Sequence, residues 1–179
     1  MAKRKSAFDK RVVICGVLVA LSVIILYLGC AIEVLDLTLS AIVSLLIVLI
    51  VIEMKHSYAW LAYIATSILS LILLPQKTPA IFYTCFMGFY PIIKSYIERI
   101  NSFVLRWVIK LIAGNAALVL MFAIIRIFVP EEFATDLIMI STYVLGIAAF
   151  IMYDIALSKL ITAYFLKIRD RLKINKYLR

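Results

Sequence analysis

Long apolar segments separated by short polar stretches run through almost the whole chain. Each has roughly 15–25 residues, against the roughly 17–25 that a transmembrane helix needs. The six segments are residues 12–31, 34–52, 57–74, 79–93, 107–129 and 133–157. This pattern predicts an all-α, polytopic integral membrane protein, with residues 1–179 forming one domain of six transmembrane helices. The fourth segment is the shortest, so we expect it to start earlier, to kink or to lie in a locally thinned bilayer.

Composition supports a membrane protein over a soluble one. Apolar residues make up 66% of the chain, whereas about 45–50% is usual in soluble domains. The first apolar segment has about 20 residues, more than the roughly 7–15 of a signal-peptide core, and is therefore predicted to be a transmembrane helix. The three cysteines have no metal-ligand spacing, and we expect buried thiols.

Basic residues predict the orientation in the cell membrane. With six transmembrane helices and a cytoplasmic N-terminus, 16 of the 19 Lys and Arg residues fall in the two tails and the cytoplasmic loops. An even number of helices with both termini cytoplasmic therefore satisfies the positive-inside rule. We interpret the net charge of +9 as a topology signal, so no nucleic-acid partner is predicted.

Two segments, near 91–104 and 158–174, have helical periodicity with one apolar face. The apolar stripes are Ile93, Ile97, Ile100 and Val104 in the first, and Ile161, Phe165, Ile168 and Leu172 in the second. Basic amphipathic helices of this kind lie on the anionic inner surface of a membrane or bind a partner. Pro91 either kinks the fourth transmembrane helix or begins a new one. We expect the fourth helix to end near Pro91, which would leave Lys94 without burial.

Four ionisable residues lie near the cytoplasmic ends of the predicted helices: Glu53, Lys94, Lys110 and Asp154. Ionisable groups in a membrane are costly and pair with one another. A network of cytoplasmic-side ion pairs is one hypothesis for them, and a role in gating or in binding a partner is the other. Snorkelling to the interface would also satisfy the longer side chains.

A second set of polar residues lies deeper or on the outer side. The candidate substrate-binding residues are Lys77, Thr78, Tyr83, Asn115 and Asp136. Asn115 is predicted near mid-membrane, where an amide needs a partner on another helix or a polar cavity. Gly114 beside it would allow the close approach of a helix or a ligand. Helix–helix bonding and substrate contact both remain open for Asn115.

Motifs for catalysis and nucleotide hydrolysis are missing from the sequence. It contains no P-loop pattern, no H-E-x-x-H and no G-x-S-x-G. His56 is the only histidine and is predicted near an inner helix end, which leaves no deeply placed Ser–His pair. We predict a protein that is not an enzyme and has no catalytic residue, cofactor or metal site.

The layout resembles the substrate-binding S components of energy-coupling factor (ECF) transporters. The predicted protein shares with these S components a small size, six helices, cytoplasmic termini, a basic N-terminus and short loops. Family members often have Ala-x-x-x-Ala on the first helix, and Gly16-Val-Leu-Val-Ala20 stands here. The resemblance implies capture of a vitamin-like solute or metal ion, with a transmembrane T component and two cytoplasmic ATPases as partners. The candidate partner-docking residues are Gly16, Ala20, Ala59 and Ala62.

Two other classes of function fit the same pattern. One is a small membrane scaffold in cell-envelope or secretion assembly, whose partners are membrane lipids and other proteins. The other is a membrane enzyme or a small transporter that works alone.

Overall fold

The structure is a computed structural model, and it describes residues 2–32, 35–54, 56–128 and 136–168. Within these residues the chain is helical and has no strand. The elements are α1 (Ala2–Ala31), α2 (Asp36–Glu53), α3 (His56–Leu73), α4 (Thr78–Phe82), the π-helix η2 (Tyr83–Met87), α5 (Tyr90–Ile97), α6 (Phe103–Phe128), α7 (Asp136–Ala163) and the π-helix η4 (Tyr164–Ile168).

Five helices in the described part of the chain are long and apolar enough to cross a membrane. The five candidate spans are Lys10–Ala31, Asp36–Glu53, His56–Leu73, Phe103–Met121 and Ser141–Leu166. They correspond to the first, second, third, fifth and sixth apolar segments of the sequence. The prediction of an all-helical chain is therefore confirmed for this part, and the length and composition of these helices fit a multi-pass membrane protein.

The fourth apolar segment is a broken helix, made of α4, η2 and α5. In its π turn, the Gly88 amide donates to the Tyr83 carbonyl at 2.7 Å, five residues back instead of four. Prolines lie at the starts of both flanking helices, Pro79 in α4 and Pro91 in α5. A proline fits the first turn of a helix because its missing N–H has no partner to lose there. The preceding helix therefore does end close to Pro91, and Pro91 lies in the first turn of a new helix, one of the two alternatives for it; that helix, α5, continues to Ile97.

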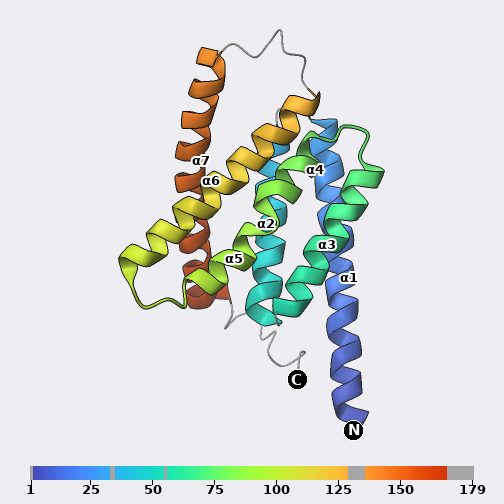
Figure 1. Ribbon diagram of the computed structural model, residues 1–179. Helices are drawn as coiled ribbons and strands as arrows, with labels where there is room; N and C mark the ends of the chain where they lie inside the picture. The colour runs from blue at the N-terminus through green and yellow to red at the C-terminus, as the bar shows by residue number, and fades with distance from the viewer. Residues whose placement is uncertain (1, 33–34, 55, 129–135, 169–179) are drawn as a thin grey trace.

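The broken segment still runs the length of the bundle, between α3 on one side and α6 on the other (Figure 1). The start of α1 and the end of α7 lie at the same end of the molecule (Figure 1). The described residues contain five helices that could cross a membrane, with the broken segment lying among them, and the even number of crossings stays a prediction. The cytoplasmic location of that end stays a prediction.

Two hydrophobic clusters fill the interior, and the broken segment contributes to both. The first joins α1, α2 and α3 to the fourth segment, with Leu26, Ile47 and Tyr83 at its centre. The second joins α6 and α7 to α2, η2 and α5, and includes Phe86 and Phe150. The α6–α7 pair thus meets the other helices mainly through the fourth segment and α2. The three cysteines are buried and free, as expected.

The predicted amphipathic helix over 91–104 is wrong. Helix α5 ends at Ile97, a turn follows, and α6 begins at Phe103. Ser102 precedes the new helix, and its carbonyl accepts a hydrogen bond from the Arg106 amide at 3.1 Å. Ile97 is 4% exposed and Val104 is 70% exposed, so they share no face. The apparent stripe assumed one continuous helix, whereas the turn between α5 and α6 interrupts the helical period.

The second predicted amphipathic segment, near 158–174, is described as far as residue 168. There it continues α7 without a break and passes into η4. Phe165 is 43% exposed, and Ile161 packs partly buried against the second hydrophobic cluster. Residues 169–174 lie outside the described residues.

Candidate functional site

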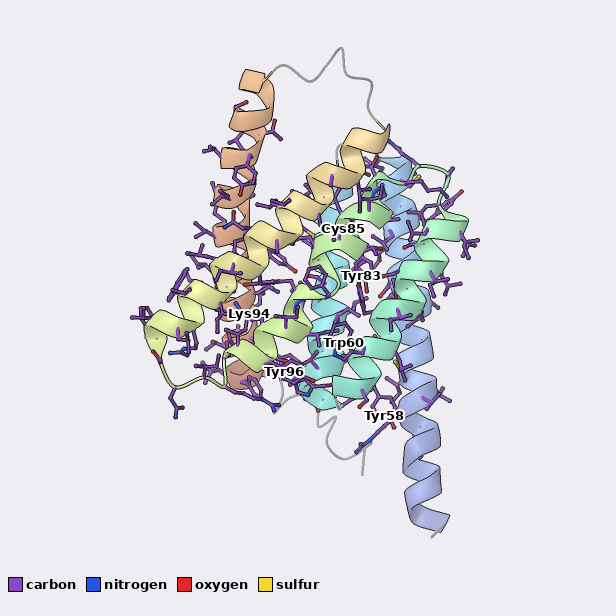
Figure 2. All side chains as sticks on the ribbon, in the orientation of Figure 1. Tyr58, Trp60, Tyr83, Cys85, Lys94 and Tyr96 are labelled. Atoms are coloured by element: carbon purple, nitrogen blue, oxygen red, sulfur yellow. The ribbon has the colours of Figure 1, made fainter. Side chains whose placement is uncertain are left out.

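A buried ion-pair network joins three helices of the bundle. Lys94 of α5 and Lys110 of α6 both donate to the carboxylate of Asp154 on α7, Lys94 to Oδ1 and Lys110 to Oδ2 at 3.0 Å. The three side chains are 1%, 11% and 5% exposed, in that order. Figure 2 labels Lys94, which lies where α5 approaches α6 and α7.

The remaining hydrogen-bonding capacity of Lys94 and Asp154 is also used. The Tyr90 hydroxyl donates to Asp154 Oδ1 at 2.7 Å. Lys94 Nζ also donates to the Asp154 carbonyl at 2.8 Å and to Ser158 Oγ at 2.7 Å. Burial of a charge in a membrane is tolerated only where such partners replace water.

Glu98 brings the network to charge balance. Its Oε1 lies 3.5 Å from Nζ of Lys94 and 3.5 Å from Nζ of Lys110. Two ammonium groups therefore face two carboxylates, and the group carries no net charge. Glu98 is 36% exposed and is the outermost member, so the network extends from the helix junction towards solvent.

Local sequence spacing positions these groups once the helices are in place. Tyr90, Lys94 and Glu98 are separated by four residues each, which places them along one side of α5 and its C-terminal turn. Asp154 and Ser158 have the same spacing on α7. Helix α5 begins at Tyr90, with Pro91 in its first turn. Lys94 is therefore part of this helix and is buried with it in the bundle.

Three of the four residues predicted as ion pairs come together, and one does not. Lys94, Lys110 and Asp154 form the network, whereas Glu53 accepts a hydrogen bond from the Tyr164 hydroxyl at 2.9 Å. The expectation that Lys94 is not buried is wrong. Tyr90 and Glu98 are further members that the predicted set of four lacks. The spacing of Lys94 and Glu98 was the available signal for one of them.

A cavity of about 330 Å³ lies beside the network, between the start of α6 and α7. Its polar lining includes Glu98, Arg106, Lys110, Asp154, Ser158 and Lys159. Phe103, Trp107 and Ile155 supply its apolar lining. The cavity is therefore amphipathic, and cations outnumber carboxylates around it.

A second, smaller cavity of about 210 Å³ lies where the start of α3 meets α5. His56 Nε2 lies 2.9 Å from Ser95 Oγ, so the structure does form a Ser–His pair, although at a helix end. Ser95 Oγ also donates a hydrogen bond to the Ile92 carbonyl at 2.6 Å. Arg99 Nη2 is 3.4 Å from the same His56 nitrogen.

This pair does not have the arrangement of a catalytic triad. A serine nucleophile needs a base that a third, usually acidic, group orients. The charged group that contacts the His56 ring here is Arg99, a cation that disfavours protonation of the imidazole. Among the described residues, no cluster of three His, Cys, Asp or Glu side chains could hold a metal ion.

Among the described residues, no contact joins the candidate substrate-binding residues into one site, and Lys77, Tyr83 and Asn115 have separate partners. Lys77 donates to the carbonyls of Leu71 at 2.7 Å and Leu74 at 2.6 Å, and so caps the end of α3. Tyr83 is fully buried, with its ring centroid 6.1 Å from that of Tyr63. Thr78 is exposed at the start of α4, far from the network in sequence and at another end of the fourth segment.

The other two candidates lie on α6 and α7. Asp136 is the first residue of α7, and its side chain lies outside the described residues. The Asn115 amide nitrogen donates to the Leu111 carbonyl at 2.9 Å, and its oxygen accepts a hydrogen bond from Tyr143 of α7. Of the two hypotheses for Asn115, these contacts favour helix–helix bonding.

Replacing Asn115 with Leu tests this assignment. We expect the stability of the protein in detergent to fall by about 0.6–1.7 kcal/mol, the range for interhelical hydrogen bonds in membrane proteins. Tyr143→Phe should cost a similar amount, and the double variant should cost no more than the larger single effect. Thermal or denaturant unfolding of the four proteins measures the coupling. Fully additive costs would exclude the Asn115–Tyr143 bond.

The four candidate docking residues divide into two pairs. Ala59 is fully buried and Ala62 is 1% exposed, so both pack inside the chain and a docking role does not fit them. Gly16 and Ala20 are exposed on α1. A Cβ atom built at Gly16 meets no other described atom within 4 Å. The small-residue stripe of α1 is therefore open to lipid or to a partner.

Comparison with known proteins adds no assignment to this geometry. No protein-family model matches the sequence, and neither a curated protein nor a solved structure matches the chain.

Proposed function

We propose that the protein is a membrane-embedded, solute-binding subunit of an importer whose ATPases are separate chains. The observation that carries the proposal is the buried, charge-balanced network of Lys94, Lys110, Asp154 and Glu98 at the broken fourth segment. Ionisable groups in membrane helices are rare and mark pathways and moving parts of transport proteins. Discontinuous helices are also typical of the sites of membrane transporters.

The network joins the α6–α7 pair to the fourth segment, which supports a role for this pair as a moving part of a transporter. Lys110 and Asp154 belong to the α6–α7 pair, and Lys94 belongs to α5. Neutralising Asp154 leaves two buried cations close together and favours separation of the helices. A few ion pairs can thus hold α6 and α7 closed against the fourth segment and release them when a solute or proton arrives.

Two features support dependence on a partner, one in the sequence and one on α1. The chain has no P-loop, so ATP hydrolysis must come from another subunit. The exposed stripe of Gly16 and Ala20 is the candidate surface for a T-like transmembrane component, because small residues let helices approach closely.

Co-purification tests the proposal. The tagged protein is expressed in its own host and solubilised gently, and its partners are identified by mass spectrometry. We expect ATPases and a T-like subunit to be captured, and Ala20→Leu to remove most of that capture. The same substitution at Ala156, an exposed alanine of α7, is the matched control and should leave capture unchanged. Native mass spectrometry of the purified complex identifies the retained solute.

A membrane scaffold is the second candidate, and the exposed stripe on α1 favours it equally. Capture of envelope-synthesis or secretion proteins without ATPases would support the scaffold and overturn the importer. A buried charge network is harder to explain on this view, because a static bundle gains as much stability from apolar side chains of similar volume.

A further inference from the structure

The cavity between the start of α6 and α7 has two cations that the ion-pair network does not use. Arg106 and Lys159 line it, and neither makes an ion pair with any described residue. The Nε atom of Arg106 is buried and has no hydrogen-bond partner within the described part of the chain. A buried donor without a partner is costly, which points to a ligand that satisfies it.

The charges around the cavity favour an anion. Its two carboxylates, Glu98 and Asp154, already face the ammonium groups of Lys94 and Lys110. Arg106 and Lys159 then leave an excess of positive charge in a site of about 330 Å³, which is large enough for a phosphate ester. Arg106 lies with its guanidinium carbon 5.9 Å from the centre of the Phe103 ring.

The apolar lining indicates where such an anion would come from. Phe103 is 66% exposed and Ile155 is 43% exposed. Both lie beside Trp107, a residue type that is enriched at membrane–water interfaces. The start of α6, which lines the cavity, lies at the same end of the bundle as the start of α1 (Figure 1), the end for which the charge pattern predicts a cytoplasmic location. Anionic lipids are concentrated in that leaflet.

We propose that this cavity binds a phosphate-bearing anion through Arg106 and Lys159, with the headgroup of an anionic phospholipid as its natural source. The guanidinium of Arg106 supplies paired N–H donors that match two phosphate oxygens. Lys159 supplies a point charge from the facing helix. The exposed apolar side chains contact the upper part of the acyl chains. Phosphate binding here is independent of whether the protein imports a solute.

Native mass spectrometry of the full-length protein in detergent measures this binding. The detergent-solubilised protein is titrated with phosphatidylglycerol, with phosphatidylcholine, and with glycerol phosphate as the soluble source of the same chemistry. Arg106→Gln and Lys159→Gln remove the two charges and keep a polar side chain at each position. Lys10→Gln is the matched control, because Lys10 is an exposed lysine on α1. Thermal unfolding checks that each variant is folded; Lys159 is exposed, and its substitution removes no described ion pair.

We expect phosphatidylglycerol to bind more tightly than phosphatidylcholine. Each cavity substitution should weaken its binding about tenfold, and Lys10→Gln by less than about twofold. If the same variants lose glycerol phosphate binding but bind phosphatidylglycerol as before, the site binds a soluble phosphate and the lipid assignment is overturned. If Lys159→Gln folds normally and binds every phosphate probe as the unchanged protein does, the proposed site is wrong.

Discussion

Replacing Asp154 with Asn is expected to lower the free energy of unfolding by about 3–5 kcal/mol, because it leaves buried ammonium groups without their carboxylate. Lys94 and Lys110 both donate to Asp154, and Lys94 is 1% exposed and cannot reach water. The asparagine can still accept the Tyr90 hydrogen bond, so the change isolates the charge. Unfolding in detergent with increasing denaturant measures the loss.

A charge-balanced double variant is the control for this prediction. Asp154→Asn combined with Lys94→Met removes one charge of each sign and leaves Lys110 facing Glu98. We expect the double variant to regain at least about half of the lost stability, because buried ion pairs replaced together cost little. Glu98→Gln, at the exposed edge, should cost less than about 1 kcal/mol. Near-wild-type stability of Asp154→Asn alone would contradict the role of the network.

Replacing Gly114 with Val is expected to destabilise the contact between α6 and α7 by about 3 kcal/mol, at the upper end of the cost of overpacking. A Cβ atom at Gly114 would lie 2.5 Å from Phe150 Cε1 and 2.7 Å from its Cζ, well inside van der Waals contact. The Phe150 ring is 4% exposed and packs against Phe86 and Tyr90, so it has little room to move. Unfolding in detergent gives the magnitude.

Gly16→Val provides the matched control, since it introduces the same side chain into a helix where a Cβ atom meets nothing described. We expect its effect on the isolated protein to stay within about 1 kcal/mol, the scale of helix propensity alone. In a Phe150→Leu background, Gly114→Val should cost clearly less than in the original chain. If Gly114→Val and Gly16→Val lower the free energy of unfolding equally, the close contact between Gly114 and Phe150 does not determine the effect of a larger side chain at position 114.

Asp154 and Gly114 both lie at the contact between α6 and α7. Gly114 and Phe150 fix how closely α6 approaches α7, and Lys110 and Asp154 lie about one turn away on the same two helices. Loss of the close contact should therefore also loosen the ion pair. The α6–α7 pair is the part of the bundle on which the proposed function depends most.

Much of the architecture could be predicted from the sequence because it follows from composition. The lengths of the apolar segments define five continuous helices, and most of their boundaries lie close to the observed ends. The exceptions are α1, which begins at Ala2 rather than near residue 12, and α7, which continues to Ala163 rather than ending near residue 157. The shortness of the fourth segment also indicated an irregular passage. Its form was not predictable, because Pro91 fits equally well at the end of one helix and at the start of another.

The candidate site was only partly predictable. Ionisable residues in apolar segments stand out in any membrane sequence, which is why Lys94, Lys110 and Asp154 could be named together. Their pairing joins residues that are 44 and 60 positions apart in the sequence. A helical period relates only residues within a few turns, so it cannot predict such pairs. The assignment of Ala59 to a docking surface failed for a related reason: small residues show that helices approach closely but not which ones.

The sequence by itself determined that this protein is a bundle of helices long and apolar enough to cross a membrane, and where most of them begin and end. It also determined which rare charges must find partners, because burying an unpaired charge in a membrane is costly. Only the tertiary structure decided which face of each helix lies inside. A helix that is apolar on every side carries little periodic signal, so the burial of Lys94 and the exposure of Gly16 depend on packing between distant segments.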